Sequence, residues 1–206
     1  MTVKEFFKSS AFKSIAVLMC IVIVCGGIIA VCNGLFYVSD EEKLLRAIGK
    51  IFGKTPEFIA ELKLTDEQKT NEYGNIEQAF FIKSDGNNLF IKATGKSEFA
   101  SGSVTTWVAV TAGECNYTDS LESAVITGIG KVRYEDDERQ TLMSKFDDKY
   151  YAQFSNNNAS IAAGGYFTAS GGSGIASPPV ASATYSSKAI VGSVNAALCY
   201  ARGGVS

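Results

Sequence analysis

The sequence predicts an α+β fold: an antiparallel sheet with flanking helices, preceded by a single N-terminal transmembrane helix. Three observations lead to it: an uncharged apolar segment near the N-terminus, a series of β-branched and aromatic runs in the middle, and an apolar helical stripe near the C-terminus. The 206 residues suffice for one domain in addition to a membrane helix. We expect a cytoplasmic N-terminus over 1–14, the transmembrane helix over 15–38 and one extracytoplasmic domain over 39–206.

The membrane anchor is predicted by residues 15–38, which contain no Asp, Glu, Lys or Arg. As a helix this segment is about 36 Å long, which exceeds a hydrocarbon core of about 30 Å. A cleaved signal peptide is the alternative, but its apolar core ordinarily runs about 7–15 residues. Three lysines before the segment favour a cytoplasmic N-terminus: Lys4, Lys8 and Lys13. Three cysteines within it are interpreted as small apolar residues of the helix: Cys20, Cys25 and Cys32.

Four runs rich in β-branched and aromatic residues are predicted to be strands: 77–83, 88–94, 104–111 and 125–134. The first two are expected to form a hairpin, because the Asp85-Gly86 pair between them favours a tight turn. Trp107, in the third run, is interpreted as a core residue. The runs together predict the antiparallel sheet.

Three segments of the domain are predicted to be helical: 41–59, 142–154 and 186–201. Pro56 is expected to mark a break or a new start within the first. In the last segment, Ser186 or Ser187 is expected to cap the N-terminus. Six residues of that segment form its apolar stripe: Ala189, Ile190, Val194, Ala197, Leu198 and Ala201. Residues 155–182 are dominated by Asn, Ser, Ala, Gly and Pro, which predicts a loop.

The composition excludes several classes of function. Lys and Arg total 19 against 21 Asp and Glu, so no basic surface for nucleic acid is indicated. The absence of His excludes His-based acid–base catalysis and His-ligated zinc or haem. The five cysteines form no C-x-x-C pair, so no metal site is expected. Redox work would therefore need a different kind of cofactor.

The segment before the last helix carries the chemistry. It reads Ala181-Ser182-Ala183-Thr184-Tyr185-Ser186-Ser187 and continues into Lys188. It resembles the flavinylation site of the FMN-binding domain shared by the G subunit of Rnf-type electron-transport complexes and the C subunit of the sodium-pumping NADH:quinone reductase. In that family a Ser-Gly-Ala-Thr-like motif opens a helix, and a flavin transferase esterifies the FMN phosphate to the Thr. The resemblance implies covalent FMN on Thr184, with contacts from Ser182, Ala183, Tyr185 and Ser186.

Two other segments are similar to the same family. Ser101-Gly102-Ser103-Val104, before the strand of Trp107, resembles its glycine turn. The segment from Glu138 to Lys145, followed by Gln153-Phe154, resembles a degraded Glu-Thr-Pro-Gly-Leu-Gly segment and the helix after it. This implies Glu138 beside the flavin and Lys145 beside its phosphate; the alternative for both is a solvated surface position. The chain departs from the motif where Pro178, Ala181 and Ser182 replace its Asp, Ser and Gly.

Elementary electrostatics also favours an anion at Thr184. The N–H groups and the positive dipole end of a helix N-terminus stabilise a phosphodiester. The alternative is ordinary helix capping by a Ser-Ala-Thr segment. Tyr185 is expected to pack beside the isoalloxazine.

The resemblance implies a function in electron transfer. The expected protein is a membrane-anchored flavoprotein subunit that relays electrons in an Rnf-type ion-translocating oxidoreductase complex, a redox subunit rather than a complete enzyme. Its expected partners are the other membrane subunits and a flavin transferase. The alternatives are a free-standing extracytoplasmic FMN-binding protein and a non-catalytic anchored surface domain that has lost the flavin.

Two further patterns have no assigned role. A disulfide between Cys115 and Cys199 is left open, because the sequence gives no geometry. Asn116-Tyr117-Thr118 and Asn158-Ala159-Ser160 match the short glycosylation pattern, which by itself assigns nothing.

Overall fold

The computed structural model places the chain in two compact units, Met1–Arg46 and Ala47–Ser206. The residues that it describes are 10–36, 42, 44–46, 48–49, 56, 58–83, 87–96, 103–134, 146–169, 175–176 and 183–203.

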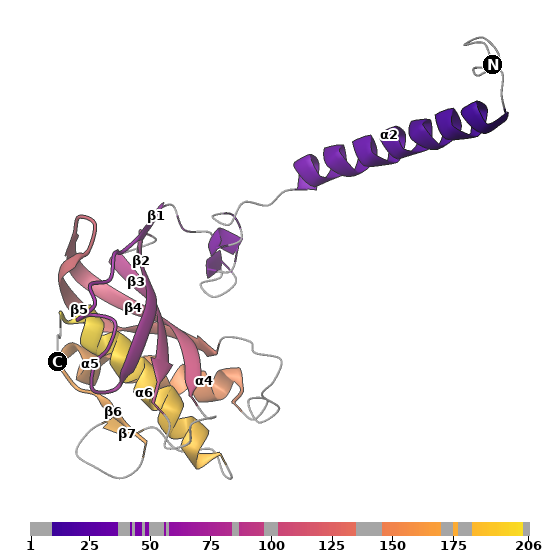
Figure 1. The fold of residues 1–206 in the computed structure, drawn as a ribbon. Coiled ribbons are helices and arrows are strands. Elements are labelled where there is room, and N and C mark those ends of the chain that lie inside the picture. The colour runs from indigo at the N-terminus through magenta and orange to yellow at the C-terminus, as the bar shows by residue number, and fades with distance from the viewer. Residues whose placement is uncertain are drawn as a thin grey trace. The chain divides into compact units, whose positions relative to one another are not determined.

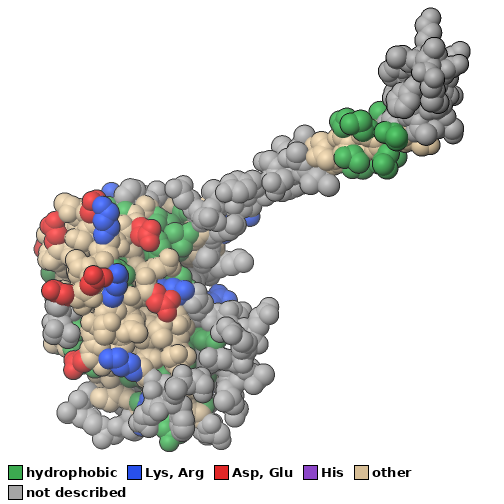
Figure 2. Space-filling view, in the orientation of Figure 1, with side chains coloured by type: hydrophobic (Ala, Val, Ile, Leu, Met, Phe, Trp, Pro, Cys, Tyr) green, Lys and Arg blue, Asp and Glu red, His purple; other side chains and the backbone are tan. Residues whose placement is uncertain are grey.

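The first unit contains the helix α2 (Ser10–Phe36). Its side chains are described at 14–15 and 17–28, and all of them are exposed. The large apolar ones appear in green in Figure 2: Ile15, Val17, Leu18, Met19, Ile21, Val22, Ile23, Val24 and Ile28. No helix within the described part of the chain combines the length and the apolar character that a membrane crossing requires.

The second unit is built on a five-stranded antiparallel sheet whose strand order follows the chain (Figure 1). The strands are β1 (Phe58–Glu61), β2 (Gly74–Lys83), β3 (Asn87–Gly95), β4 (Val104–Tyr117) and β5 (Leu121–Tyr134). The predicted antiparallel sheet is therefore confirmed, and all four predicted strands are present. The strands β4 and β5 run further than predicted, because their hairpin closes only at residues 118–120. The predicted turn at Asp85-Gly86 lies outside the described residues.

The first predicted helix, over residues 41–59, does not extend to its predicted C-terminal end. Residues 42, 44–46 and 48–49 are helical, but Phe58 and Ile59 belong to β1 and pair with Lys83 and Ile82 of β2. The helical period of the sequence does not extend to these two residues, since pairing with the edge of a sheet depends on tertiary context.

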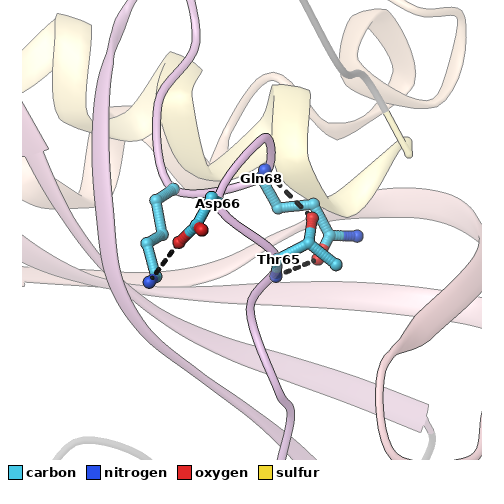
Figure 3. Close-up of polar contacts among 4 residues, drawn as sticks. Thr65, Asp66 and Gln68 are labelled. Atoms are coloured by element: carbon cyan, nitrogen blue, oxygen red, sulfur yellow. Dashed lines mark hydrogen bonds and ion pairs between the residues drawn. The ribbon is translucent and has the colours of Figure 1, made fainter.

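The connection between β1 and β2 contains a turn at residues 65–69 (Figure 3). The Thr65 N–H donates to Oε1 of Gln68 at 3.1 Å, and the Gln68 N–H donates to Oγ1 of Thr65 at 3.3 Å. This reciprocal pattern is that of a helix capping box. Lys69 forms an exposed ion pair with Asp66 at 2.7 Å. The turn therefore satisfies its backbone donors locally.

The helix α6 (Thr184–Ala201) crosses one face of the sheet (Figure 1). All six residues of the predicted apolar stripe are buried, which confirms that stripe. The predicted cap is wrong, because the helix begins two residues earlier, with Ala183 as its N-cap. Ser187 is only 1% exposed and lies within the helix. Burial against the sheet, rather than a capping hydroxyl, thus determines where α6 starts.

Three polar contacts fix α6 on the sheet and on the segment after α5. Asn195 exchanges two hydrogen bonds with the backbone of Phe167, at 2.9 and 2.8 Å. Asn71 donates its amide to the Ala196 carbonyl at 3.0 Å. The hydroxyls of Thr106 and Ser193 lie 2.7 Å apart. These bonds satisfy buried polar groups and set the position of the helix.

Trp107 lies outside the main core. Its neighbour Val108 belongs to the core cluster, and successive residues of a strand face opposite sides. The half-buried indole stacks on Phe90 with centroids 4.6 Å apart, and the Lys92 ammonium lies 5.7 Å from its centroid. Contrary to the prediction, Trp107 is therefore not part of the main core but is half-buried on the face of the sheet opposite that core.

The segment after β5 contains more structure than predicted. The helix α4 (Asp148–Ser155) starts later than residue 142, because Asp147 caps it by accepting the Tyr150 N–H at 2.8 Å. The predicted loop 155–182 contains α5 (Asn158–Ala162), β6 (Phe167–Thr168) and β7 (Ile175–Ala176). Ile161 and Phe167 are buried, so packing rather than local propensity orders these elements.

We expect stability to fall in alkaline solution. Burial, with a smaller contribution from Glu72, raises the pKa of Tyr73 to about 12. Burial also raises the pKa of Tyr151 and of Tyr200. The unfolded chain releases these protons near pH 10, so their stabilising contribution is complete below pH 10 and is lost as pH rises toward 12. Denaturant melts combined with tyrosinate absorbance measure this loss.

Tyr200→Phe separates this effect from general alkaline damage. The Tyr200 hydroxyl has no hydrogen-bond partner among the described residues, so its removal should change neutral stability by less than about 1 kcal/mol and reduce the alkaline loss. The control Tyr185→Phe, at an exposed position, should leave that loss unchanged. Simultaneous ionisation of all nine tyrosines near pH 10 in the folded chain would contradict the prediction.

Candidate functional site at the start of α6

The residues of the predicted site that the structure describes lie in one short stretch of chain at the start of α6. Thr184 is the first residue of α6 and is exposed. Ala183 precedes it and is buried, Tyr185 is 47% exposed, and Ser186 is half-buried. The remaining predicted site residues, Ser182, Glu138 and Lys145, lie outside the described residues.

The start of α6 suits a negatively charged group. The hydrogen-bond ladder begins with the Ser187 N–H, which donates to the Ala183 carbonyl at 2.9 Å. Ala183 has no side chain able to cap the helix, and no acidic residue lies in the first turn. The helix has 18 residues, so its dipole is well developed at this end. A phosphate attached to Thr184 would therefore lie where N–H groups and positive potential favour it.

Lys188 is a residue of the site that the sequence prediction missed. It follows Thr184 by four positions, which places both on one side of the helix. Its ammonium lies 5.7 Å from the centroid of the Tyr185 ring. The four-residue spacing was the signal that could have identified it. Lys188 adds a positive charge and borders the aromatic surface of Tyr185.

These groups fit the phosphate end of a covalently attached FMN. Thr184 offers an accessible hydroxyl, the helix end and Lys188 offer positive potential, and Tyr185 offers an exposed ring. A Thr hydroxyl is a weak nucleophile without an adjacent base, so a separate transferase would have to activate it. Among the described residues, no group of three or more His, Cys, Asp or Glu side chains is placed to hold a metal ion.

Cys115 and Cys199 do not form the disulfide that the sequence left open. Burial raises the pKa of both thiols, which disfavours the reactive thiolate. Neither cysteine is therefore a candidate nucleophile.

No model of a known protein family matches the chain, and no curated protein matches it. The resemblance to the FMN-binding domain therefore rests on the quoted residues alone.

Proposed function

We propose that the chain is a membrane-anchored flavoprotein subunit with FMN esterified to Thr184, which relays electrons in an Rnf-type ion-translocating oxidoreductase complex. One observation carries the proposal: an exposed Thr opens an uncapped 18-residue helix that has Lys188 one turn further on. The flavin, when attached, supplies the electron-transfer chemistry. The chain holds its phosphate and presents Tyr185 beside it.

The anchor in this proposal is the uncharged segment 15–38. The large apolar side chains described on α2 are exposed, and an apolar exterior suits contact with lipid. With the N-terminus in the cytoplasm, residues 39–206 lie outside it, beside the other membrane subunits.

Thr184→Val should abolish covalent flavin. Valine matches threonine in shape but has no hydroxyl to form the phosphoester. The chain is expressed with an active flavin transferase, denatured and inspected on a gel under ultraviolet light, and its mass is measured. We expect wild type to carry one FMN and Thr184→Val to carry none, while Thr184→Ser keeps part of the label.

Ser186→Ala is the matched control, since it removes a neighbouring hydroxyl and should leave the label on Thr184. Lys188→Gln should lower the yield of labelled chain by weakening the attraction for phosphate. If the wild-type chain shows no flavin fluorescence although the co-expressed transferase labels another protein, the covalent flavin is refuted.

A second candidate is a non-catalytic anchored surface domain that has lost the flavin. Pro178, Ala181 and Ser182 stand where the family motif has Asp, Ser and Gly, and this favours it. A dark wild-type chain that folds normally would select this candidate.

A further inference from the structure

We propose that Asn116 is an acceptor for N-linked glycosylation by a periplasmic-type oligosaccharyltransferase, and that Asn158 is not. The chain has two Asn-x-Ser/Thr sequences, Asn116-Tyr117-Thr118 and Asn158-Ala159-Ser160. Both asparagine side chains are exposed, and they differ in the groups that their carboxamides contact. The inference rests on the extracytoplasmic topology of the proposed function and is independent of the flavin.

Asn116 lies near the end of the β4–β5 hairpin with its side chain in solvent. Its amide donates an exposed hydrogen bond to Oγ of Ser123 at 3.3 Å. The ring of the next residue, Tyr117, packs at a tilt against Phe81 with centroids 4.1 Å apart. The ladder shifts register between Asn116 and Tyr117, and the Asn116 side chain is exposed. Thr118 is exposed at the bend that closes the hairpin. A bulky substituent on Asn116 therefore meets no packed element of the described chain.

The surroundings of Asn116 also favour a glycan. Glu114, two residues before it, is exposed as well. Val125 lies two residues after Ser123, the strand partner of Asn116, and so shares its face of the hairpin. Val125 is 58% exposed, an unusual position for a large apolar side chain in this domain. A glycan on Asn116 would shield it from solvent.

The Asn158 amide, in contrast, is part of the fold. Its Oδ1 accepts the Ile129 N–H at 3.0 Å and so caps a backbone donor of the edge strand β5. Its carboxamide lies against Gly128: a Cβ at Gly128 would be 2.8 Å from Nδ2 of Asn158. A sugar on this nitrogen would separate α5 from β5.

The transfer is a simple substitution. Nδ2 of Asn116 forms a bond to the anomeric carbon of a polyprenyl-diphosphate oligosaccharide. The bond between that carbon and the diphosphate oxygen breaks, polyprenyl diphosphate leaves, and Nδ2 loses one proton. The transferase and the lipid-linked sugar are the required co-reactants.

The test uses the full chain in bacterial cells that carry a periplasmic oligosaccharyltransferase and its lipid-linked oligosaccharide. Thr118→Ala destroys the first acceptor sequence without touching Asn116, and Ser160→Ala destroys the second without touching Asn158. A further version carries an exposed acceptor peptide after Ser206, which reports topology. Gel mobility, lectin binding and peptide mass measure the glycan, and circular dichroism confirms folding.

We expect one glycan on wild type, its complete loss in Thr118→Ala, its retention in Ser160→Ala, and a second glycan on the appended acceptor. An unmodified Asn116 beside a modified appended acceptor would overturn the inference and leave the topology intact. A glycan on Asn158 in the folded chain would overturn it as well. If neither Asn116 nor the appended acceptor is modified, the topology and the inference fail together, and the separate FMN assay still tests the flavin.

Discussion

Gly95→Ala is expected to lower the free energy of unfolding by more than about 3 kcal/mol, beyond the usual cost of an overpacked site. A Cβ at this position would lie 1.8 Å from the Ala189 carbonyl oxygen and 2.6 Å from the Ser193 nitrogen. Both atoms belong to the backbone of α6, so no side-chain rotation relieves the clash. The helix itself would have to move away from β3.

Such a movement would also weaken the polar contacts that hold α6. The bond between Thr106 and Ser193, at 2.7 Å, and the bond from Asn71 to the Ala196 carbonyl, at 3.0 Å, join the same helix to the sheet and to the β1–β2 connection. The steric clash and the weakened hydrogen bonds should therefore lower the free energy of unfolding together. Chemical denaturation of the full chain in detergent, followed by circular dichroism, measures it.

Gly130→Ala is the matched control for the same chemical change. A Cβ at Gly130 would meet its nearest neighbour, Oγ1 of Thr111, at 3.5 Å, which is ordinary contact. We expect a change within about 0.5 kcal/mol. Equal stability for the Gly95→Ala and Gly130→Ala variants would show that α6 does not approach β3 as closely as described.

Asn195→Ala is the second substitution with a large expected effect, a loss of about 3 kcal/mol. The side chain is 3% exposed and makes hydrogen bonds to both the N–H and the carbonyl of Phe167. Removing it leaves two buried backbone groups without those partners, and each such group costs about 1–3 kcal/mol. The same denaturation experiment measures the loss.

Limited proteolysis gives Asn195→Ala a second readout. Cleavage near β6 should become faster, because that strand loses its attachment to α6. The control is Asn75→Ala, whose exposed amide accepts one bond from Thr70 at 3.2 Å; its loss should stay within about 0.5 kcal/mol. Unchanged proteolysis and equal stability in the two variants would contradict the role given to Asn195.

The sequence could predict the part of the candidate site that lies within one short segment of chain. Thr184 at an exposed helix start follows from a polar stretch that runs into an apolar stripe, and the structure places it there. Whether FMN occupies it depends on a transferase and on partner subunits. Lys188 was missed although its four-residue spacing from Thr184 is visible in the sequence, because the predicted helix began only at residue 186, whereas α6 begins at Thr184.

Local periodicity determined β2, β3 and the buried stripe of α6, because the backbone geometry of a strand or helix fixes which residues share a face. Tertiary structure decided the position of β1, the lack of a disulfide between Cys115 and Cys199, and the close approach of α6 at Gly95. Each depends on which distant segments meet. Burial drives those segments together without regard to their separation in sequence, and the shape of the assembled layers then decides where a Cβ or a disulfide can fit.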